Sequence, residues 1–268
     1  MSEHLGRVLI FAGSDSGGGA GVQADIKTVT ALGGHAATAI TAITVQNTLG
    51  VMDVHPLPAA LVAAQARAVL DDIGADAIKT GMLGDTAMIE QVAAILAEAG
   101  APAVIDPVMI AKGGAALLEP YAVQALADAL IPLAALLTPN APEAAALTGR
   151  PVETTDDLRR AGYALLQKGA AAVLMKGGHV AGDRVTDLLI TPVSETRFEA
   201  GRIDTRHTHG TGCTLASACA AGLAQGHGLE QAVRRAHAYV QEAIRRAPGL
   251  GAGHGPLDHA WPLRDREA

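Results

Sequence analysis

Short apolar runs alternate along the chain with longer segments of helical character. We predict strands over residues 8–12, 39–45, 77–80, 103–106, 135–138 and 171–176, and helices over residues 20–32, 58–72, 86–99, 115–129 and 156–168. Strands that alternate with helices in this way predict a parallel sheet covered on both faces. The strands are almost continuously apolar, which is typical of a sheet buried on both sides.

The last third of the chain departs from this alternation. Residues 185–190 and 195–200 are separated by a short polar turn and predict a hairpin at one edge of the sheet, and two helices follow from about residues 214 and 229. We find no linker rich in proline, serine or charge, and no internal repeat. We therefore predict an α/β protein with one domain over residues 1–268: a three-layer α/β/α sandwich with a mostly parallel central sheet and no separate lid domain.

The composition excludes several classes of partner. Hydrophobic residues make up 49% of the 268 residues but aromatic residues only 2%, which argues against a surface that stacks on nucleic-acid bases. The net charge of −7 argues against binding to polyanions. We see no signal peptide and no apolar run of the roughly 18 residues that a membrane span needs. The two cysteines, Cys213 and Cys219, fall on different faces of one helix, so we expect a reduced, soluble, cytoplasmic protein.

Residues with chemical potential follow the predicted strands. In open parallel sheets, ligands bind at the carboxyl ends of the strands. The residues at these ends, which we expect to share one rim, are those at 13–21, Gln46, Asn47, Gly81, Met82, Asp106, Asn140 and Lys176.

A Thr-His-Gly-Thr-Gly-Cys-Thr run at residues 208–214 precedes a good helix former and predicts a phosphate site. Gly210 and Gly212 allow a tight turn, and the helix that begins there adds free N–H groups and a positive dipole end. Cys213 would face the anion as a nucleophile or proton acceptor. The alternative is that Cys213 is simply a small buried residue.

The glycine-rich turn at residues 13–21 superficially resembles a dinucleotide site, because Gly19, Gly21 and Ala24 have the right spacing. No acid follows the second strand before Asp53 to hold a ribose, and no lysine follows the glycines before Lys27. We therefore expect a mobile or close-approach turn beside a small substrate, with a merely flexible turn as the alternative.

His207 and His209 suggest a metal site, but no third ligand with suitable spacing accompanies them. We expect His209 to orient the phosphate loop instead.

Five motifs occur in register along the chain. They are Gly-Ser-Asp with Gly-Gly-Ala-Gly-Val-Gln-Ala-Asp at 13–15 and 18–25, Asp-Pro-Val-Met at 106–109, Thr-Pro-Asn-x-x-Glu at 138–143, Lys-Gly-Gly-His at 176–179 and Gly-Thr-Gly-Cys at 210–213. Together they resemble the bacterial hydroxymethylpyrimidine/phosphomethylpyrimidine kinases of thiamine biosynthesis, in the ribokinase-like superfamily. The resemblance runs from about residue 8 to residue 263. It departs at Ser16 and Gly17, where many relatives carry Pro-Ser.

The resemblance implies a function. It implies ATP-dependent phosphorylation of the hydroxymethyl group of 4-amino-5-hydroxymethyl-2-methylpyrimidine, and then of the monophosphate to the diphosphate. The partners would be this aminopyrimidine alcohol and its monophosphate, ATP and Mg²⁺, with a monovalent cation left open, and the protein would be a homodimer.

The implied phosphate side of the site has two parts. Amides at Gly210, Thr211, Gly212 and Cys213 would stabilise the transferring phosphoryl group. Lys176 would reach the ATP phosphates, unless it is a solvated surface lysine.

Oxygen-bearing side chains are expected to hold Mg²⁺ beside the ATP. Asp106, Asn140 and Glu143 carry suitable ligands, with Asp106 and Glu143 binding the metal partly through water. Alternatively, Asn140 and Glu143 cap a helix and Asp106 is an ordinary strand-end acid.

The substrate side is expected to contain Gly13, Asp25, Gln46 and Met82. Gln46 offers a donor and an acceptor to an aminopyrimidine edge, although it is also an ordinary loop residue. Met82 would be an adaptable apolar wall, with plain core packing as the alternative.

Cys213 stands where many relatives in the superfamily carry Asp, so a proton acceptor at this position would be a thiolate. We expect the helix N-terminus to lower the pKa of this thiol.

Other readings of the chain remain. They are a pyridoxal or hydroxyethylthiazole kinase of the same superfamily, a non-catalytic ligand-binding sensor, and an NAD oxidoreductase, which the missing ribose acid disfavours.

Overall fold

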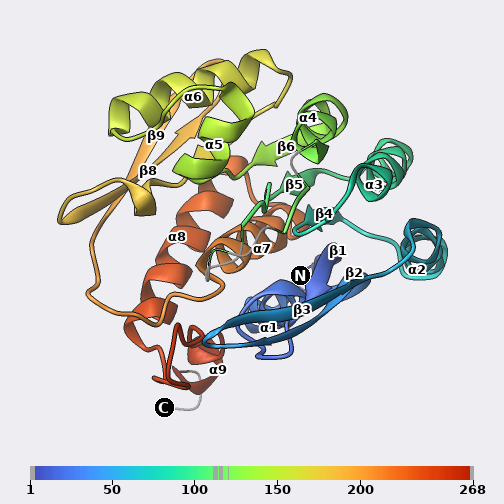
Figure 1. Ribbon diagram of the computed structural model, residues 1–268, viewed down its shortest axis with the longest axis horizontal. Helices are drawn as coiled ribbons and strands as arrows, with labels where there is room; N and C mark the ends of the chain where they lie inside the picture. Colours follow the sequence, from blue (N-terminus) through green and yellow to red (C-terminus); the bar gives the residue numbers. More distant parts are fainter. Residues whose placement is uncertain (1–3, 111–113, 115–116, 120, 266–268) are drawn as a thin grey trace.

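The computed structural model describes residues 4–110, 114, 117–119 and 121–265 (Figure 1). The strands are β1 (Arg7–Ser14), β2 (His35–Asn47), β3 (Gly50–Pro56), β4 (Ala77–Thr80), β5 (Ala103–Ile105), β6 (Ala134–Leu137), β7 (Val173–Met175), β8 (Arg184–Ile190) and β9 (Glu195–Gly201). The α-helices are α1 (Gly21–Ala31), α2 (Ala59–Asp72), α3 (Thr86–Ala99), α4 (Ala122–Ala125), α5 (Ala141–Thr148), α6 (Thr155–Gln167), α7 (Thr211–Ala224), α8 (Leu229–Arg245) and α9 (Trp261–Asp265).

All of these strands belong to one sheet with the order β3-β2-β1-β4-β5-β6-β7-β8-β9. In the sheet, the run β2-β1-β4-β5-β6-β7 is parallel throughout. Strand β3 pairs with β2 in antiparallel fashion at one edge, and β8 and β9 form antiparallel pairs at the other. The mostly parallel sheet and the edge hairpin are thus confirmed. The sequence prediction omitted β3, most of whose residues are exposed and therefore carry little apolar pattern.

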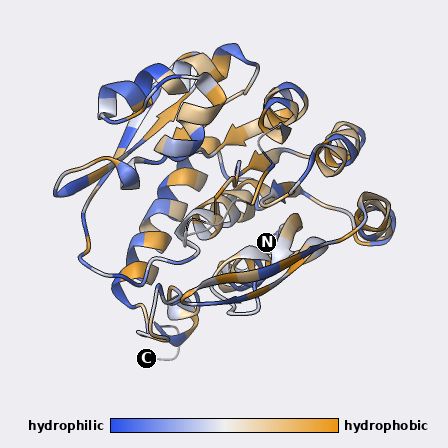
Figure 2. Cartoon of the chain, in the orientation of Figure 1, coloured by the Kyte–Doolittle hydropathy of each residue, from blue (hydrophilic) through white to orange (hydrophobic). Residues whose placement is uncertain are grey.

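Helices cover both faces of the sheet (Figure 1). Val8 and Ile10 on β1 belong to one core cluster together with residues of α1, α7 and α8, whereas Leu9 and Phe11 belong to the other cluster, with residues of α2, α3, α5 and α6. This alternation follows from the two-residue period of a strand. Figure 2 shows apolar strands at the centre and polar residues gathered on outer helices such as α6. The predicted three-layer sandwich is confirmed.

The helix predicted over residues 115–129 is the main local error. Residues 115, 116 and 120 lie outside the described residues. The backbone N–H groups of Leu117 and Glu119 donate to carbonyls of Met109 and Gly84, so this stretch is not helical. The helix begins at Ala122, continues as a π-helical turn over Leu126–Leu130 and ends in a 3-10 turn over Ile131–Leu133. Helix α9 was also not predicted.

The strand order creates one favoured place for a ligand. From β1 the chain proceeds to β2 on one side, and β4 then returns to the other side of β1. At such a switch point, the connections leave a crevice outside the carboxyl ends of the strands. Helices α1 and α7 both begin beside this crevice (Figure 1). No described helix combines the length and apolar character that a membrane span requires.

Candidate active site

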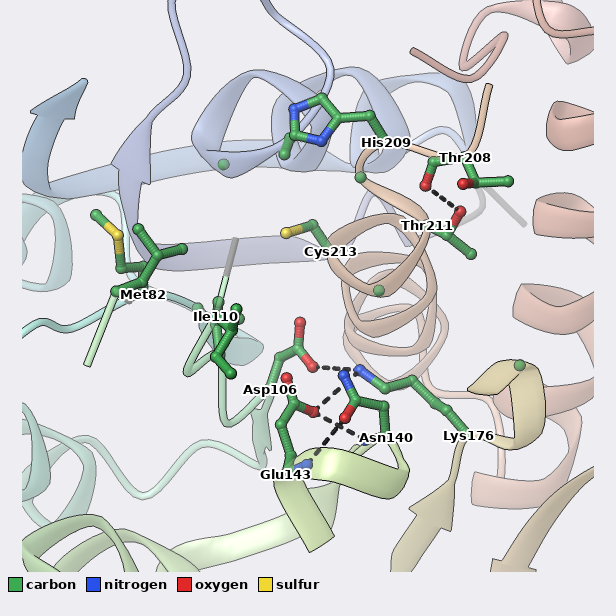
Figure 3. Close-up of a pocket in the computed structure, with 18 of the residues that line it drawn as sticks. Met82, Asp106, Ile110, Asn140, Glu143, Lys176, Thr208, His209, Thr211 and Cys213 are labelled. Atoms are coloured by element: carbon green, nitrogen blue, oxygen red, sulfur yellow. Dashed lines mark hydrogen bonds and ion pairs between the residues drawn. The ribbon is translucent and has the colours of Figure 1, made fainter. Parts of the chain in front are cut away.

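A cavity of about 1020 Å³ opens at the carboxyl ends of the strands. Most of the residues predicted for the site line it: Gly13, Gln46, Met82, Asp106, Asn140, Glu143, Lys176, Gly210, Thr211, Gly212 and Cys213. The predicted rim therefore exists as one continuous surface. Figure 3 shows Asp106, Asn140, Glu143 and Lys176 gathered together, Cys213 above them at the start of α7, and Met82 at a distance.

The phosphate loop is held by a close backbone contact. Gly210 has a φ of +83°, and a Cβ on it would lie 1.8 Å from the carbonyl oxygen of Gly19. Only glycine fits this position, which joins the first turn to the start of α7. Gly210 is the N-cap residue of α7 and provides no side-chain cap. The first-turn amides of Gly212 and Cys213 are therefore left for a ligand.

Lys176 forms a buried cluster with two carboxylates. Its Nζ lies 2.8 Å from Oδ1 of Asp106 and 3.7 Å from Oε2 of Glu143. Thr138 also donates a hydrogen bond to Oδ1 of Asp106. The Lys176 side chain is only 12% exposed, so the alternative of a solvated surface lysine is wrong. Asp106 is likewise no ordinary strand-end acid, because it is buried and paired.

Burial and charge oppose each other in this cluster. Burial raises the pKa of Glu143 to about 7, although the nearby Lys176 charge acts to lower it. For Lys176, burial would lower the pKa, but the carboxylates of Asp106 and Glu143 outweigh it and hold the pKa above its usual range. Lys176 is thus a permanent cation, whereas Glu143 takes up protons near neutral pH in the metal-free protein.

Asn140 and Glu143 do cap helix α5. The side chain of Asn140 accepts from the Glu143 amide at 2.9 Å, and Glu143 accepts from the Asn140 amide at 2.8 Å. This reciprocal capping box confirms the structural alternative. It also fixes both side chains at the cavity wall, so capping is compatible with ligand binding.

The described residues contain no cluster of three or more His, Cys, Asp or Glu side chains arranged to hold a metal. Mg²⁺ is commonly bound by one or two carboxylates together with water and substrate phosphates. The buried oxygens of Asp106 and Glu143 beside the cavity fit that mode of binding.

Cys213 lies in the first turn of α7 and lines the cavity, while Cys219 is fully buried, and both are free thiols. The expectation of a lowered pKa is wrong for the ligand-free protein. Burial raises the pKa of the Cys213 thiol to about 11, and the nearby Lys79 charge only partly opposes this. Loss of hydration, together with the charges of Asp25 and Asp106, therefore outweighs the charge of Lys79, and the thiol is neutral at neutral pH.

The substrate side of the cavity is closely packed. A Cβ on Gly13 would lie 2.4 Å from Cε of Met82, so this glycine lets the methionine approach the backbone. Met82 is 9% exposed and also lines the cavity. Met82 therefore packs in the core and also forms part of the cavity wall.

An acid that the sequence reasoning did not assign to the site fixes the glycine-rich turn. Asp15 accepts hydrogen bonds from the amides of Gly19 and Ala20, and its Oδ2 lies 2.9 Å from Nε2 of His209. The same His209 nitrogen lies 3.2 Å from the side-chain nitrogen of Gln46. The turn is therefore not merely flexible. His209 joins this turn to the phosphate loop, as expected. The sequence signal for Asp15 was an acid placed among glycines.

Asp25 is the one predicted site residue that does not line the cavity. It is fully buried, and its Oδ2 lies 2.8 Å from Nζ of Lys79. Ser217 donates to its other carboxylate oxygen at 2.7 Å. Sequence reasoning also overlooked Lys79, although a lysine within the apolar strand β4 is itself a signal, because lysine is almost never fully buried unless paired.

The fold and the cavity together define a class of protein. Helix N-terminal amides, a permanent cation and carboxylates suited to Mg²⁺ face one cavity with an apolar and amide-bearing side. This is the arrangement of a phosphotransferase that acts on a small molecule. The family model described as phosphomethylpyrimidine kinase matches residues 15–258. The chain belongs to the phosphomethylpyrimidine kinase family.

Individual proteins agree with this assignment. The chain is 52% identical to a hydroxymethylpyrimidine/phosphomethylpyrimidine kinase of Streptomyces coelicolor, over 96% of this chain and 95% of that protein. Pyridoxal kinase of Bacillus subtilis in an ADP complex superposes with a TM-score of 0.90 and 37% identity, over 97% of this chain and 99% of that one. Phosphomethylpyrimidine kinase of Clostridium difficile has a TM-score of 0.79 and 41% identity, over 89% and 99%. These structures confirm the ribokinase-like fold.

Proposed function

We propose that this chain phosphorylates the hydroxymethyl group of 4-amino-5-hydroxymethyl-2-methylpyrimidine with ATP, and then phosphorylates the monophosphate to the diphosphate, in thiamine biosynthesis. The observation that carries this proposal is the near full-length identity of 52% to a hydroxymethylpyrimidine/phosphomethylpyrimidine kinase. The ADP complex of a structural relative supports a nucleotide site of the same kind. The cavity provides room for both ligands.

The phosphoryl group is transferred at the start of α7. The amides of Gly212 and Cys213 donate to its oxygens, and Gly210 and Thr211 set the turn that aims them. Lys176 contacts the ATP phosphates as a point charge. Phosphoryl transfer depends on positioning and charge neutralisation more than on covalent assistance, so fixed amides and a permanent cation suit it.

Mg²⁺ fits beside Lys176. Asp106 and Glu143, with Asn140 next to them, provide the buried oxygens that would hold the ion, partly through water. When bound, the ion neutralises phosphate charge. A cation at this place also favours the ionised form of Glu143, whose burial otherwise raises its pKa to about 7.

The pyrimidine lies toward Gln46 and Met82, with Gly13 as the close backbone approach. The Gln46 amide presents a donor and an acceptor, which match the edge of an aminopyrimidine ring. Cys213 lies in the first turn of α7 beside the phosphate loop, where its thiolate form would accept the proton of the reacting hydroxyl. Asp25 acts beneath the cavity rather than on the substrate.

The same proposal covers the form of the protein. The chain acts as one domain, in the cytoplasm, as a homodimer. Apolar side chains exposed on β2 and β3, including Val45 at 51% and Met52 at 63%, support a dimer contact there. We expect light scattering to give twice the chain mass, and a Val45→Lys, Met52→Lys variant to shift toward the monomer. A wild-type monomer at assay concentrations would exclude the dimer.

Pyridoxal is the second candidate substrate, because the TM-score of 0.90 belongs to a pyridoxal kinase. The deciding experiment is a steady-state assay of ADP release with ATP and Mg²⁺ on hydroxymethylpyrimidine, its monophosphate, pyridoxal and hydroxyethylthiazole. Fastest turnover of the first two supports the proposal. Fastest turnover of pyridoxal would overturn the assignment of Gln46 and Met82. ATP binding with no turnover of any substrate would favour a sensor.

A further inference from the structure

A fully buried ion pair lies beneath the first turn of α7. Lys79 occupies the middle of β4, and its side chain and that of Asp25 are both 0% exposed. Nζ of Lys79 lies 2.8 Å from Oδ2 of Asp25, and Ser217 donates to Oδ1 at 2.7 Å. Burying two charges costs several kcal/mol per ion, roughly, before their attraction is counted. A buried ion pair at this sheet position therefore carries a large desolvation cost.

Helix geometry places Asp25 one turn below Gly21, and its partner Ser217 one turn below Cys213. Asp25 follows Gly21 by four residues on α1, and Ser217 follows Cys213 by four residues on α7. Residues four apart lie on the same face of a helix, about one turn and roughly 6 Å apart along its axis. Gly21 and Cys213 occupy the upper turns, and the amide of Gly21 hydrogen-bonds to Cys213. The ion pair occupies the turn below both.

Lys79 also reaches the floor of the cavity. Its Nζ lies 2.9 Å from the position that a Cβ on Gly81 would occupy, and Gly81 lines the cavity. The ammonium is thus separated from the ligand space by little more than a glycine. No side chain can be added at Gly81 without moving the lysine.

The charged groups that face Cys213 act in opposite directions. Lys79, from β4, is the strongest charge that favours the thiolate, whereas Asp25 and Asp106 favour the neutral thiol. Lys176 also interacts electrostatically with Cys213. The two members of the buried pair therefore have opposite effects on one reactive atom.

We infer that Lys79 is a positioning residue for Cys213: its buried ammonium provides the fixed positive charge that favours a thiolate there, and Asp25 limits how much of that charge the sulfur senses. This inference rests on the proposed role of Cys213 as proton acceptor. It assigns Asp25 to the electrostatics of the thiol instead of to substrate contact. It requires the two residues to oppose each other.

The test measures alkylation of Cys213 by iodoacetamide against pH. The protein carries Cys219→Ala, so that one thiol reacts, and is kept free of metal and nucleotide. We expect Lys79→Met to slow alkylation about tenfold at a fixed pH below the thiol pKa, and Asp25→Asn to speed it about tenfold, since one pKa unit changes the thiolate fraction about tenfold. A purely structural role would not move the thiol pKa in opposite directions.

Matched variants keep the test decisive. Lys79→Arg retains the charge and is expected to stay near wild type, and Lys168→Met removes an exposed lysine at the end of α6 as the control. If Lys79→Met fails to fold, Asp25→Asn alone still decides. An unchanged pH profile of alkylation in folded Asp25→Asn would overturn the inference.

The outcome is separable from the proposed function, because alkylation needs no substrate. Opposite shifts without any kinase activity would uphold the role of Lys79 and reject the function. Kinase activity with unchanged alkylation profiles would uphold the function and reject the role of Lys79. In an active enzyme, we expect Lys79→Met to lower kcat and shift its pH profile upward, with the KM for ATP unchanged.

Discussion

Gly210→Ala is the sharpest perturbation of the phosphate loop. An added Cβ would lie 1.8 Å from the carbonyl oxygen of Gly19, and ordinary contact begins near 3.4 Å, so the two loops must separate by the difference, about 1.6 Å. The φ of +83° adds roughly 1–2 kcal/mol of strain for a residue with a side chain. A misplacement of about 1 Å can lower a rate roughly 10²-fold. We therefore expect kcat to fall at least about 10²-fold.

The assay is steady-state ADP release, paired with thermal unfolding. The strain predicts a drop in Tm of roughly 2–8 °C, so the variant remains folded at 25 °C while its rate collapses. Gly178→Ala is the control, because Gly178 lines the same cavity and a Cβ there has no atom within 4 Å. A folded Gly210→Ala variant with a rate within about threefold of wild type, roughly 0.7 kcal/mol, would refute the reasoning.

Three further predictions concern single side chains. Glu143→Gln keeps the helix cap but removes a carboxyl whose folded pKa, about 7, exceeds its unfolded value of 4.5. Between these two pKa values the folded wild type binds more protons than the unfolded chain, so its stability falls as pH rises. The metal-free variant lacks this loss, and its Tm should rise relative to that of wild type between pH 5 and 8. A Tm difference between the two proteins that does not change with pH would contradict this. His209→Ala breaks the contacts to Asp15 and Gln46 and should raise the KM for the pyrimidine about tenfold, measured beside the KM for ATP. Cys213→Ala should lower kcat about 10²–10⁴-fold while ATP binding, measured by calorimetry, persists; an unchanged rate would leave only the amides at this position.

The sequence was sufficient for the central layers of the fold. Strand β4 over Ala77–Thr80 and helix α3 over Thr86–Ala99 were predicted with the observed bounds. Buried parallel strands are apolar almost throughout, so their positions can be predicted from the sequence. Strand β3 was missed because it is an exposed edge strand, and its identity depends on pairing with β2 rather than on its own pattern.

The site was predictable where topology alone determines it. Residues that directly follow parallel strands, such as Asp106 and Lys176, meet at one rim in any fold of this class. How deeply a residue is buried below this rim does not follow from topology, because it depends on which elements pack over that residue. Asp25 and Lys79 therefore lie below the cavity, and the pKa of Cys213 rises where the helix N-terminus alone suggested a fall.

Two lysine–aspartate pairs interact electrostatically with Cys213, and their different exposure to solvent indicates different roles. The pair of Lys176 and Asp106 borders the cavity, with 12% of the lysine side chain exposed, so phosphate or a cation can replace either partner's contact. The pair of Lys79 and Asp25 is sealed at 0% exposure, so no ligand can exchange with it. Under the proposed function, the pair of Lys176 and Asp106 can thus rearrange as ATP arrives and ADP leaves. On our inference, the pair of Lys79 and Asp25 would hold a constant field at the sulfur throughout, which is what electrostatic preorganisation requires.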